Sequence, residues 1–266
     1  MRHSLTIYWR LLGVQLRSQM QYRLSFWMKV GSASLTVFFE FAAVALVLER
    51  FGNISGWTIG EVAVLYGLVE IAFGWMDMIF SGFDPPRFGR HIRQGGFDQM
   101  LLRPVNITIQ VFGSGMELRR LAKVAMGILI LSYGLGQVTI IWTATKILLA
   151  AVSVVSMFCF FGGLFIIGST ITFWTVESIE AINILTYGGS QLIQYPMHIY
   201  QRWMRDLFTF VVPAIFLNYF PVLYLLDKSD PLNFPAFAPF ASPLVGLGML
   251  LVALAFWQFG IKHYQS

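Results

Sequence analysis

Long apolar runs separated by short polar segments dominate this chain. Six such runs cover residues 26–48, 58–80, 124–138, 146–173, 208–226 and 244–261. A helix of about 20 apolar residues crosses the hydrocarbon core of a bilayer, which is about 30 Å thick. We therefore expect an all-α polytopic membrane protein with six transmembrane helices, organised as a single domain over residues 1–266. The third run is short, and Gly134 and Gly136 are expected to break it.

Two flanking segments have patterns of their own. Residues 1–23 place Leu5, Tyr8, Trp9, Leu12 and Leu16 at helical spacing, with arginines largely on other faces. This pattern predicts an amphipathic helix lying in the inner headgroup layer. Residues 227–243 carry four prolines among aromatic side chains, which favours a compact, half-inserted external cap.

The charges define an orientation. Only 12% of the 266 residues are charged, about half of what soluble domains carry. With the N-terminus inside, fifteen of the eighteen Lys and Arg residues fall in predicted cytoplasmic segments, and only Arg50, Lys146 and Lys228 fall outside. This bias predicts that the chain crosses the cell membrane with both termini in the cytoplasm. The basic residues do not line one exposed polar surface, so the net charge of +5 does not indicate a nucleic acid partner.

The second and third apolar runs are separated by a polar stretch from Phe83 to Asn106, FDPPRFGRHIRQGGFDQMLLRPVN. Asp84 before two prolines predicts a helix start, and Gly95 predicts its end in a left-handed turn. A second short helix is expected from Phe97 until Pro104 stops it. We therefore expect residues 84–106 to form a cytoplasmic loop with two short helices.

This loop has more apolar side chains than a solvated loop needs. They are Phe97, Met100, Leu101 and Leu102. Exposed apolar side chains between arginines predict a docking surface for another protein. Basic clusters beside membrane spans also bind anionic headgroups, so composition alone leaves a lipid-bound loop equally open.

Two motifs resemble a known family. GGFDQMLLRPVN is similar to the cytoplasmic motif G-x-F/L-D-x-x-L-L-R-P-x-N of a branch of the ABC-2 type transporter permeases. YPMHIY, in a predicted second cytoplasmic loop over residues 181–202, resembles the Y-P-x-x-I-Y of that family. It precedes a proline-containing fifth span, as the family pattern does. The resemblance covers most of the chain, and the first motif is the more specific of the two.

The resemblance implies a partner arrangement. In this family two permease chains pair, identical or homologous, and each binds a separate ATPase subunit, two copies in all, through the first cytoplasmic loop. It implies an ATPase-coupling role for Phe97, Asp98, Met100, Leu101, Leu102, Arg103 and Pro104. The chain contains no G-x-x-x-x-G-K-[ST] motif, so ATP and Mg are expected on the partner ATPase and no cofactor on this chain. The implied function is export of an amphipathic, lipid-like or drug-like substrate.

Two acidic residues lie deep in predicted spans. Glu40 is a little beyond the middle of the first and Glu70 is midway along the second. A charge near the bilayer centre costs on the order of 3 kcal/mol, so both should face protein or water. They either line a translocation cavity for cationic or amphipathic cargo, or they are protonated or hydrogen-bonded helix-packing residues, which is the favoured interpretation. The four histidines are scattered, and no metal site is expected.

Two other functions fit the same pattern. A membrane scaffold would recruit a cytosolic partner through the same loop without transporting anything. A membrane-embedded lipid-modifying enzyme would use the intramembrane acids, but it would also need a nucleophile or a metal set, and the sequence offers no such constellation. The chain is therefore expected to be a transport subunit, not an enzyme.

Overall fold

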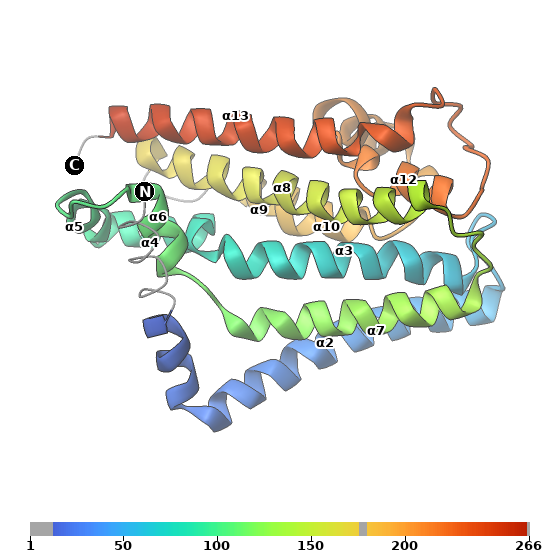
Figure 1. The fold of residues 1–266 in the computed structure, drawn as a ribbon, viewed down its shortest axis with the longest axis horizontal. Helices are drawn as coiled ribbons and strands as arrows, with labels where there is room; N and C mark the ends of the chain where they lie inside the picture. The colour runs from blue at the N-terminus through green and yellow to red at the C-terminus, as the bar shows by residue number, and fades with distance from the viewer. Residues whose placement is uncertain (1–12, 176–179, 265–266) are drawn as a thin grey trace.

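The computed structural model describes residues 13–175 and 180–264, and their regular elements are helices. Long helices run lengthwise through the structure (Figure 1). They are α2 (Arg23–Phe51), α3 (Ile59–Ile79), α7 (Leu121–Gln137), α8 (Ala144–Thr175) and α13 (Ser242–His263). Helix α2 diverges obliquely from the others toward its N-terminal end. The all-α prediction is confirmed for this part of the chain.

The two ends of the bundle differ. At one end α3, α8 and α13 finish and α2 and α7 begin, beside the short helices α4 (Pro85–Arg93), α5 (Gly96–Leu101) and α6 (Ile107–Ser114) (Figure 1). We call this the basic end, because it holds the arginines of the polar stretch. The opposite end holds the connections over residues 52–58, 138–143 and 226–241.

Four helices are long and apolar enough to cross a membrane. They are Arg23–Phe51, Ile59–Ile79, Ala144–Thr175 and Ala238–His263. They overlap the predicted first, second, fourth and sixth spans, and the last includes the short 3-10 helix η7 (Ala238–Ala241) before α13. At 17 residues α7 is at the lower limit of the length that crosses a bilayer. The count of six spans therefore stays a prediction.

Glycines bring α3 and α7 into backbone contact. A Cβ at Gly67 would lie 2.7 Å from the Leu131 nitrogen, and one at Gly134 would lie 2.8 Å from the Gly60 oxygen. Small residues permit this close approach between helices in membranes. The prediction that Gly134 and Gly136 break the third span is wrong, because α7 continues through both to Gln137. Gly134 is a packing position instead.

Residues 181–202 do not form a loop at one end of the bundle, so the prediction of a loop is wrong. Most of the segment is helical, in α9 (Glu180–Asn183), the π-helical turn η3 (Ile184–Gly188) and α10 (Gly189–Leu192). It begins beside Asp84 at the basic end. It finishes at the opposite end, where His198 Nε2 lies 3.2 Å from the Ser55 oxygen. The YPMHIY motif therefore lies far from α4 and α5.

Pro213 and Pro221 in the predicted fifth span predict kinks, and the chain is indeed bent at Pro213, so sharply that two separate helical halves form. Arg202–Val211 comprises α11 (Arg202–Asp206) and η5 (Leu207–Val211), and Ala214–Leu225 comprises η6 (Ala214–Phe216) and α12 (Tyr219–Leu225). The two halves meet at 79° beside Pro213. Proline lacks the amide that would continue a helix.

The bent pair enters the bundle and returns to the opposite end. Its first limb begins near His198 and reaches inward until Phe208 contacts Gly189. Its second limb finishes where Asp227 bonds Lys146 at the start of α8. The amide of Asn218 donates to the Leu65 oxygen (3.1 Å) and the Ile193 oxygen (2.8 Å) and secures the turn.

This path also changes the predicted charge count. Arg202 and Arg205 begin the first limb, so they belong to the opposite end. Moving both changes the distribution of Lys and Arg to thirteen and five. The excess of basic residues remains at the same end.

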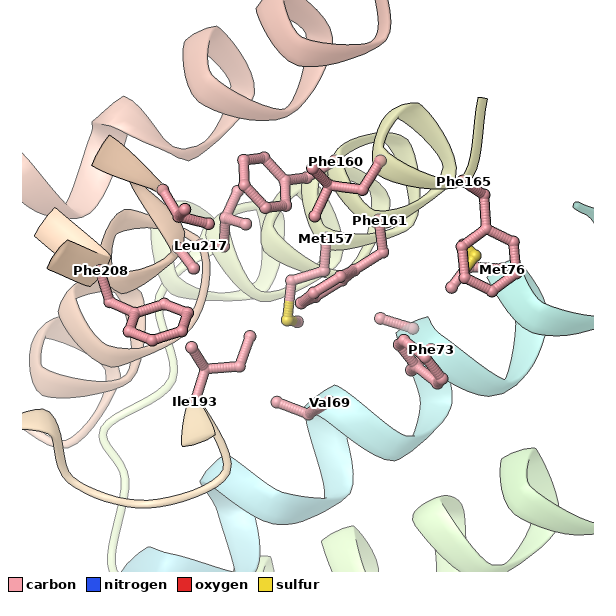
Figure 2. Packing of buried hydrophobic residues seen from close by; sticks show 14 of the residues in the cluster. Val69, Phe73, Met76, Met157, Phe160, Phe161, Phe165, Ile193, Phe208 and Leu217 are labelled. Carbon is pink, nitrogen blue, oxygen red and sulfur yellow. The ribbon is translucent and has the colours of Figure 1, made fainter. Parts of the chain in front are cut away.

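The apolar core lies between α3, α8 and the bent pair. Figure 2 shows Phe73 of α3 facing α8, with Ile193, Phe208 and Leu217 closing one side. The rings of Phe73 and Phe161 meet edge to face at 5.4 Å. This core fixes α8 relative to α3, and the ends of both helices then position the basic end.

The N-terminal helix is only partly described. Residues 1–12, which include Leu5, Tyr8, Trp9 and Leu12, lie outside the described residues, and residues 13–21 are helical. The Gln19 side chain donates to the Met116 oxygen (2.6 Å) and accepts from the Leu118 amide (2.9 Å). This helix is thereby attached to the connection between α6 and α7. Its location in the headgroup layer stays a prediction.

Segment 226–241 is held by charged side chains. Lys146 Nζ lies 2.6 Å from Asp227 Oδ2, and Lys228 Nζ lies 2.8 Å from Glu61 Oε1. The Asp230 carboxylate accepts hydrogen bonds from two amides farther along the segment. These contacts give residues 227–243 a defined path, and their external location stays a prediction.

Candidate functional site

The helix pair in the polar stretch forms close to where the sequence predicts. Helix α4 begins at Pro85 with Asp84 in the capping position, and Gly95 adopts the left-handed conformation (φ 68°) that ends it. The Asp84 side chain makes no capping hydrogen bond, so only its position is as expected. Burial, and then the neighbouring Asp77 carboxylate, raise the pKa of Asp84 to about 6.

Phe97 is a buried anchor and not part of a docking surface. Its side chain is fully enclosed, with ring centroids 4.9 Å from Tyr264, 5.0 Å from Phe173 and 5.7 Å from Phe88. Trp257 of α13 completes this ring cluster at 6.4 Å. The expectation that Phe97 is presented to a partner is wrong, because its ring fills the junction of α5 with the ends of α8 and α13.

Two further predicted coupling residues also face inward. Met100 is 7% exposed. Asp98 accepts a hydrogen bond of 3.1 Å from the Tyr264 hydroxyl, just beyond α13. Helix α5 is therefore fixed to α13 through Phe97 and Asp98, and neither Phe97 nor Met100 offers its side chain to a partner.

The remaining predicted residues form an exposed tip. Leu102 is 86% exposed and Leu101 is 41% exposed, and Arg103 and Pro104 are also exposed. We call residues 101–104 the tip. An apolar pair beside an arginine, projecting from a packed base, is the kind of surface that binds another protein.

A buried glutamine holds the tip in shape. Gln110 Nε2 donates to the Met100 oxygen and the Val105 oxygen, at 3.0 Å each, and so joins the two ends of the tip to α6. Trp257 Nε1 then donates to Thr108 Oγ1 at 3.0 Å, which connects α6 to α13. The tip is therefore connected to α13 by hydrogen bonds as well as by rings.

Charged side chains brace the base of α4. Arg87 lies 3.3 Å from Glu117, and Arg119 lies 2.7 Å from the same carboxylate. Arg120 lies 2.6 Å from Asp77 at the end of α3. Burial raises the pKa of Glu117, but the guanidinium groups of Arg119 and Arg120 outweigh it and lower the pKa below its usual value. The network ties α3, α4 and the start of α7 together.

The two membrane acids have different surroundings. Glu70 is 4% exposed and accepts a hydrogen bond of 2.8 Å from Gln194 Nε2. Glu40 lies on the exposed surface of α2 and accepts a bond of 3.4 Å from the Tyr66 hydroxyl. Within one chain, Glu70 has the contacts of a helix-packing residue. Glu40 is close enough to interact electrostatically with Glu70, and both acids interact with Tyr66.

Several important residues were not identified from the sequence. Gln110 and Gln194 are isolated amides in apolar surroundings, a signal that was available. Trp257 lies within an apolar run, and nothing in its local sequence shows that it meets Phe97, 160 positions away. Only the folded chain identifies that pair.

Comparison with known proteins identifies the family of this chain. The family described as ABC-2 family transporter protein matches residues 34–266, which is most of the chain. A search of curated proteins and a search of solved structures each found no match. The matched region contains the helix pair, the tip and the long apolar helices. The chain therefore belongs to the ABC-2 transporter family, and it is a multi-pass transmembrane permease that functions in transport.

Proposed function

We propose that this chain is the membrane subunit of an ATP-driven ABC exporter, and that the tip binds a separate ATPase subunit. The observation that carries this proposal is the exposed apolar pair Leu101 and Leu102 on a base packed against two long helices. Burial of an exposed leucine against a partner protein removes its apolar surface from water and therefore favours binding. On this proposal the tip faces the cytoplasm, as do both chain ends.

The contacts of the tip support a route for force. A push on the tip acts on α5 and α6 together, because Gln110 joins them. Phe97 and Trp257 pass it to the ends of α8 and α13. We propose that two ATPase copies, each binding ATP and Mg, close on ATP binding and move these helices in two paired permease chains, identical or homologous. The substrate site then opens toward the outside.

The proposed substrate class is amphipathic, lipid-like or drug-like. Glu70 supports a packing role within one chain, whereas Glu40 is exposed and available to a cavity formed by a second chain. We expect Glu70→Gln to leave transport of a cationic dye near wild type and Glu40→Gln to lower it several-fold. Dye efflux from vesicles measures both, and unchanged efflux in Glu40→Gln removes the cavity role.

The substitution Leu102→Asp tests the tip. A carboxylate at an apolar contact is desolvated without a partner, so we expect the affinity for the ATPase to fall at least tenfold and coupled transport to be lost. Phe237→Asp is the matched control, because Phe237 is also highly exposed (67%) but lies at the opposite end. Binding to the purified ATPase subunit and its stimulated ATP hydrolysis are measured. Full binding and full stimulation with Leu102→Asp would overturn the proposal.

A scaffold that recruits a cytosolic protein without transport uses the same tip. Purification of the chain with its partners distinguishes the two, since a partner without ATPase activity supports the scaffold. The family match favours transport over a lipid-modifying enzyme.

A further inference from the structure

A groove runs between α2 and the start of α7 at the basic end, on the side away from the tip. Its cavity is about 620 Å³. One wall comes from α2 and the other from the turn that leads into α7 (η2, Leu118–Arg120) and from α7 itself. The lining residues are Leu24, Ser25, Met28, Lys29, Ser32, Ala33, Thr36, Arg119, Arg120 and Lys123.

Four cations line this groove without a carboxylate among its lining residues. Arg119 is partly engaged by Glu117, which lines the adjoining cavity, and Arg120 is engaged by Asp77 (2.6 Å) and Glu117. Lys29 is exposed and takes part in none of the ion pairs found among the described residues. It lines both cavities, so its ammonium group is available to an anion that enters from either side.

The depth of Lys29 fits a headgroup. Helix α2 has 29 residues and is about 43 Å long, which matches a bilayer with its headgroup layers. Lys29 lies six residues beyond Arg23, or about 9 Å from the helix start. That distance reaches the boundary between headgroups and hydrocarbon, where a lysine stem lies along apolar surface and its charge faces the polar layer.

The rest of the groove combines apolar side chains with the small hydroxyl residues Ser25, Ser32 and Thr36. Leu24 is 77% exposed and Met28 is 66% exposed on the same wall as Lys29. Ala33 and Thr36 extend this wall one to two turns farther toward the middle of α2. A ligand that satisfies the groove therefore has an anionic head and at least one apolar chain.

We propose that the groove binds an anionic phospholipid from the membrane leaflet at the basic end. The phosphate lies against Lys29 and Arg119, and an acyl chain follows Leu24, Met28 and Ala33. Free phosphate satisfies only the cations and leaves the apolar wall in water. The bound lipid joins α2 to the start of α7, which are otherwise the outer pair of the bundle at this end (Figure 1).

Binding of short-chain phosphatidylglycerol to the purified full chain in detergent tests the proposal. Short-chain phosphatidylcholine and inorganic phosphate are the comparison ligands. Thermal stabilisation and native mass spectrometry report binding. We expect wild type to bind phosphatidylglycerol, to bind phosphatidylcholine at least fivefold more weakly, and not to be stabilised by inorganic phosphate.

Two variants test separately how the lipid headgroup and the acyl chain contribute to binding. Lys29→Glu removes the unpaired cation and should weaken phosphatidylglycerol binding at least fivefold, the weight of about one cation at an anionic membrane surface. Ala33→Trp keeps every charge but fills the apolar wall, and it should weaken binding of both lipids. Lys262→Glu is the matched control, an exposed lysine at the same end of the bundle that does not line the groove.

The outcomes are distinct. If Lys29→Glu and Lys262→Glu weaken phosphatidylglycerol binding equally, the lipid is attracted to the basic surface in general, and the proposed site is wrong. If phosphatidylglycerol and phosphatidylcholine bind equally well, the cations do not recognise the anionic headgroup and the proposal is wrong. If inorganic phosphate stabilises the chain and phosphatidylglycerol does not, the groove is a phosphate site and not a lipid site. None of these measurements depends on an ATPase, so the result stands apart from the function proposed above.

Discussion

Helix α5 and segment 226–241 are attached to the bundle in different ways. Helix α5 is held mainly by rings, with Phe97 enclosed by side chains from α4, α8 and α13. Segment 226–241 is attached through lysines, Lys146 to Asp227 and Lys228 to Glu61, as well as through Phe234, whose ring lies 5.0 Å from that of Phe220. Burying a phenylalanine contributes about 1.5–3 kcal/mol. A solvent-exposed ion pair contributes about 0–1 kcal/mol, but here only Asp227 is exposed, whereas Lys146, Lys228 and Glu61 are largely buried.

The difference indicates which attachment is rigid. Ring packing is insensitive to salt, and it fixes the base of the tip to the long helices. Ion pairs weaken as salt screens them, and Asp227 is 61% exposed. We therefore expect the attachment of α5 to be less sensitive to salt than the lysine contacts of segment 226–241.

Phe97→Ala should lower the stability of the chain more than Asp227→Asn. Removing an enclosed ring leaves a cavity at the junction of three helices, and we expect the free energy of unfolding to fall by about 3–5 kcal/mol. Thermal unfolding in detergent measures it. Phe259→Ala, at an exposed ring near the same end of α13, is the control and should change the midpoint little. Similar losses in both variants would show that Phe97 is not the anchor.

Asp227→Asn should have a smaller effect that depends on salt. It leaves the ammonium of Lys146, which is 6% exposed, without its anion. We expect a loss of about 1 kcal/mol, limited because water reaches the Asp227 side. The loss should shrink between low and high salt, as followed by chemical denaturation. If the loss of stability is the same at low and high salt, the Lys146–Asp227 contact is not weakened by screening, and the expected difference from the ring cluster around Phe97 is wrong.

Asp84→Asn should change the pH dependence of stability. The folded pKa of about 6 lies above the ordinary 3.8, so the contribution of Asp84 to stability is fully present below about pH 4 and is lost as pH rises through 6. Wild type should therefore gain stability relative to Asp84→Asn between pH 7 and pH 5.

One neighbour of Asp84 acts in the opposite direction. Burial, and then Arg87 and Arg103, lower the pKa of His91, so its contribution is lost as pH falls. It is present in both proteins, so the difference between them isolates Asp84. Asp206→Asn, at a half-exposed carboxylate on α11, is the control. Parallel pH profiles for wild type and Asp84→Asn would show that burial of Asp84 has no energetic consequence.

The sequence determined the elements whose cause is local. Apolar length predicts α2, α3, α8 and α13, and the proline pair with Gly95 predicts the helix pair that carries the tip. Both depend on neighbouring residues alone, through hydrophobic transfer and backbone conformation. The family motif and the family match lead to the same class of transporter.

Tertiary structure decided what each side chain faces. Phe97 and Leu102 belong to the same apolar motif, and only packing against α8 and α13 buries one and exposes the other. The bent pair likewise depends on Asn218 reaching two carbonyl groups 153 and 25 positions away. Contacts between distant segments leave no local pattern in the sequence, because they are selected by how the helices fit together and not by the residues beside them.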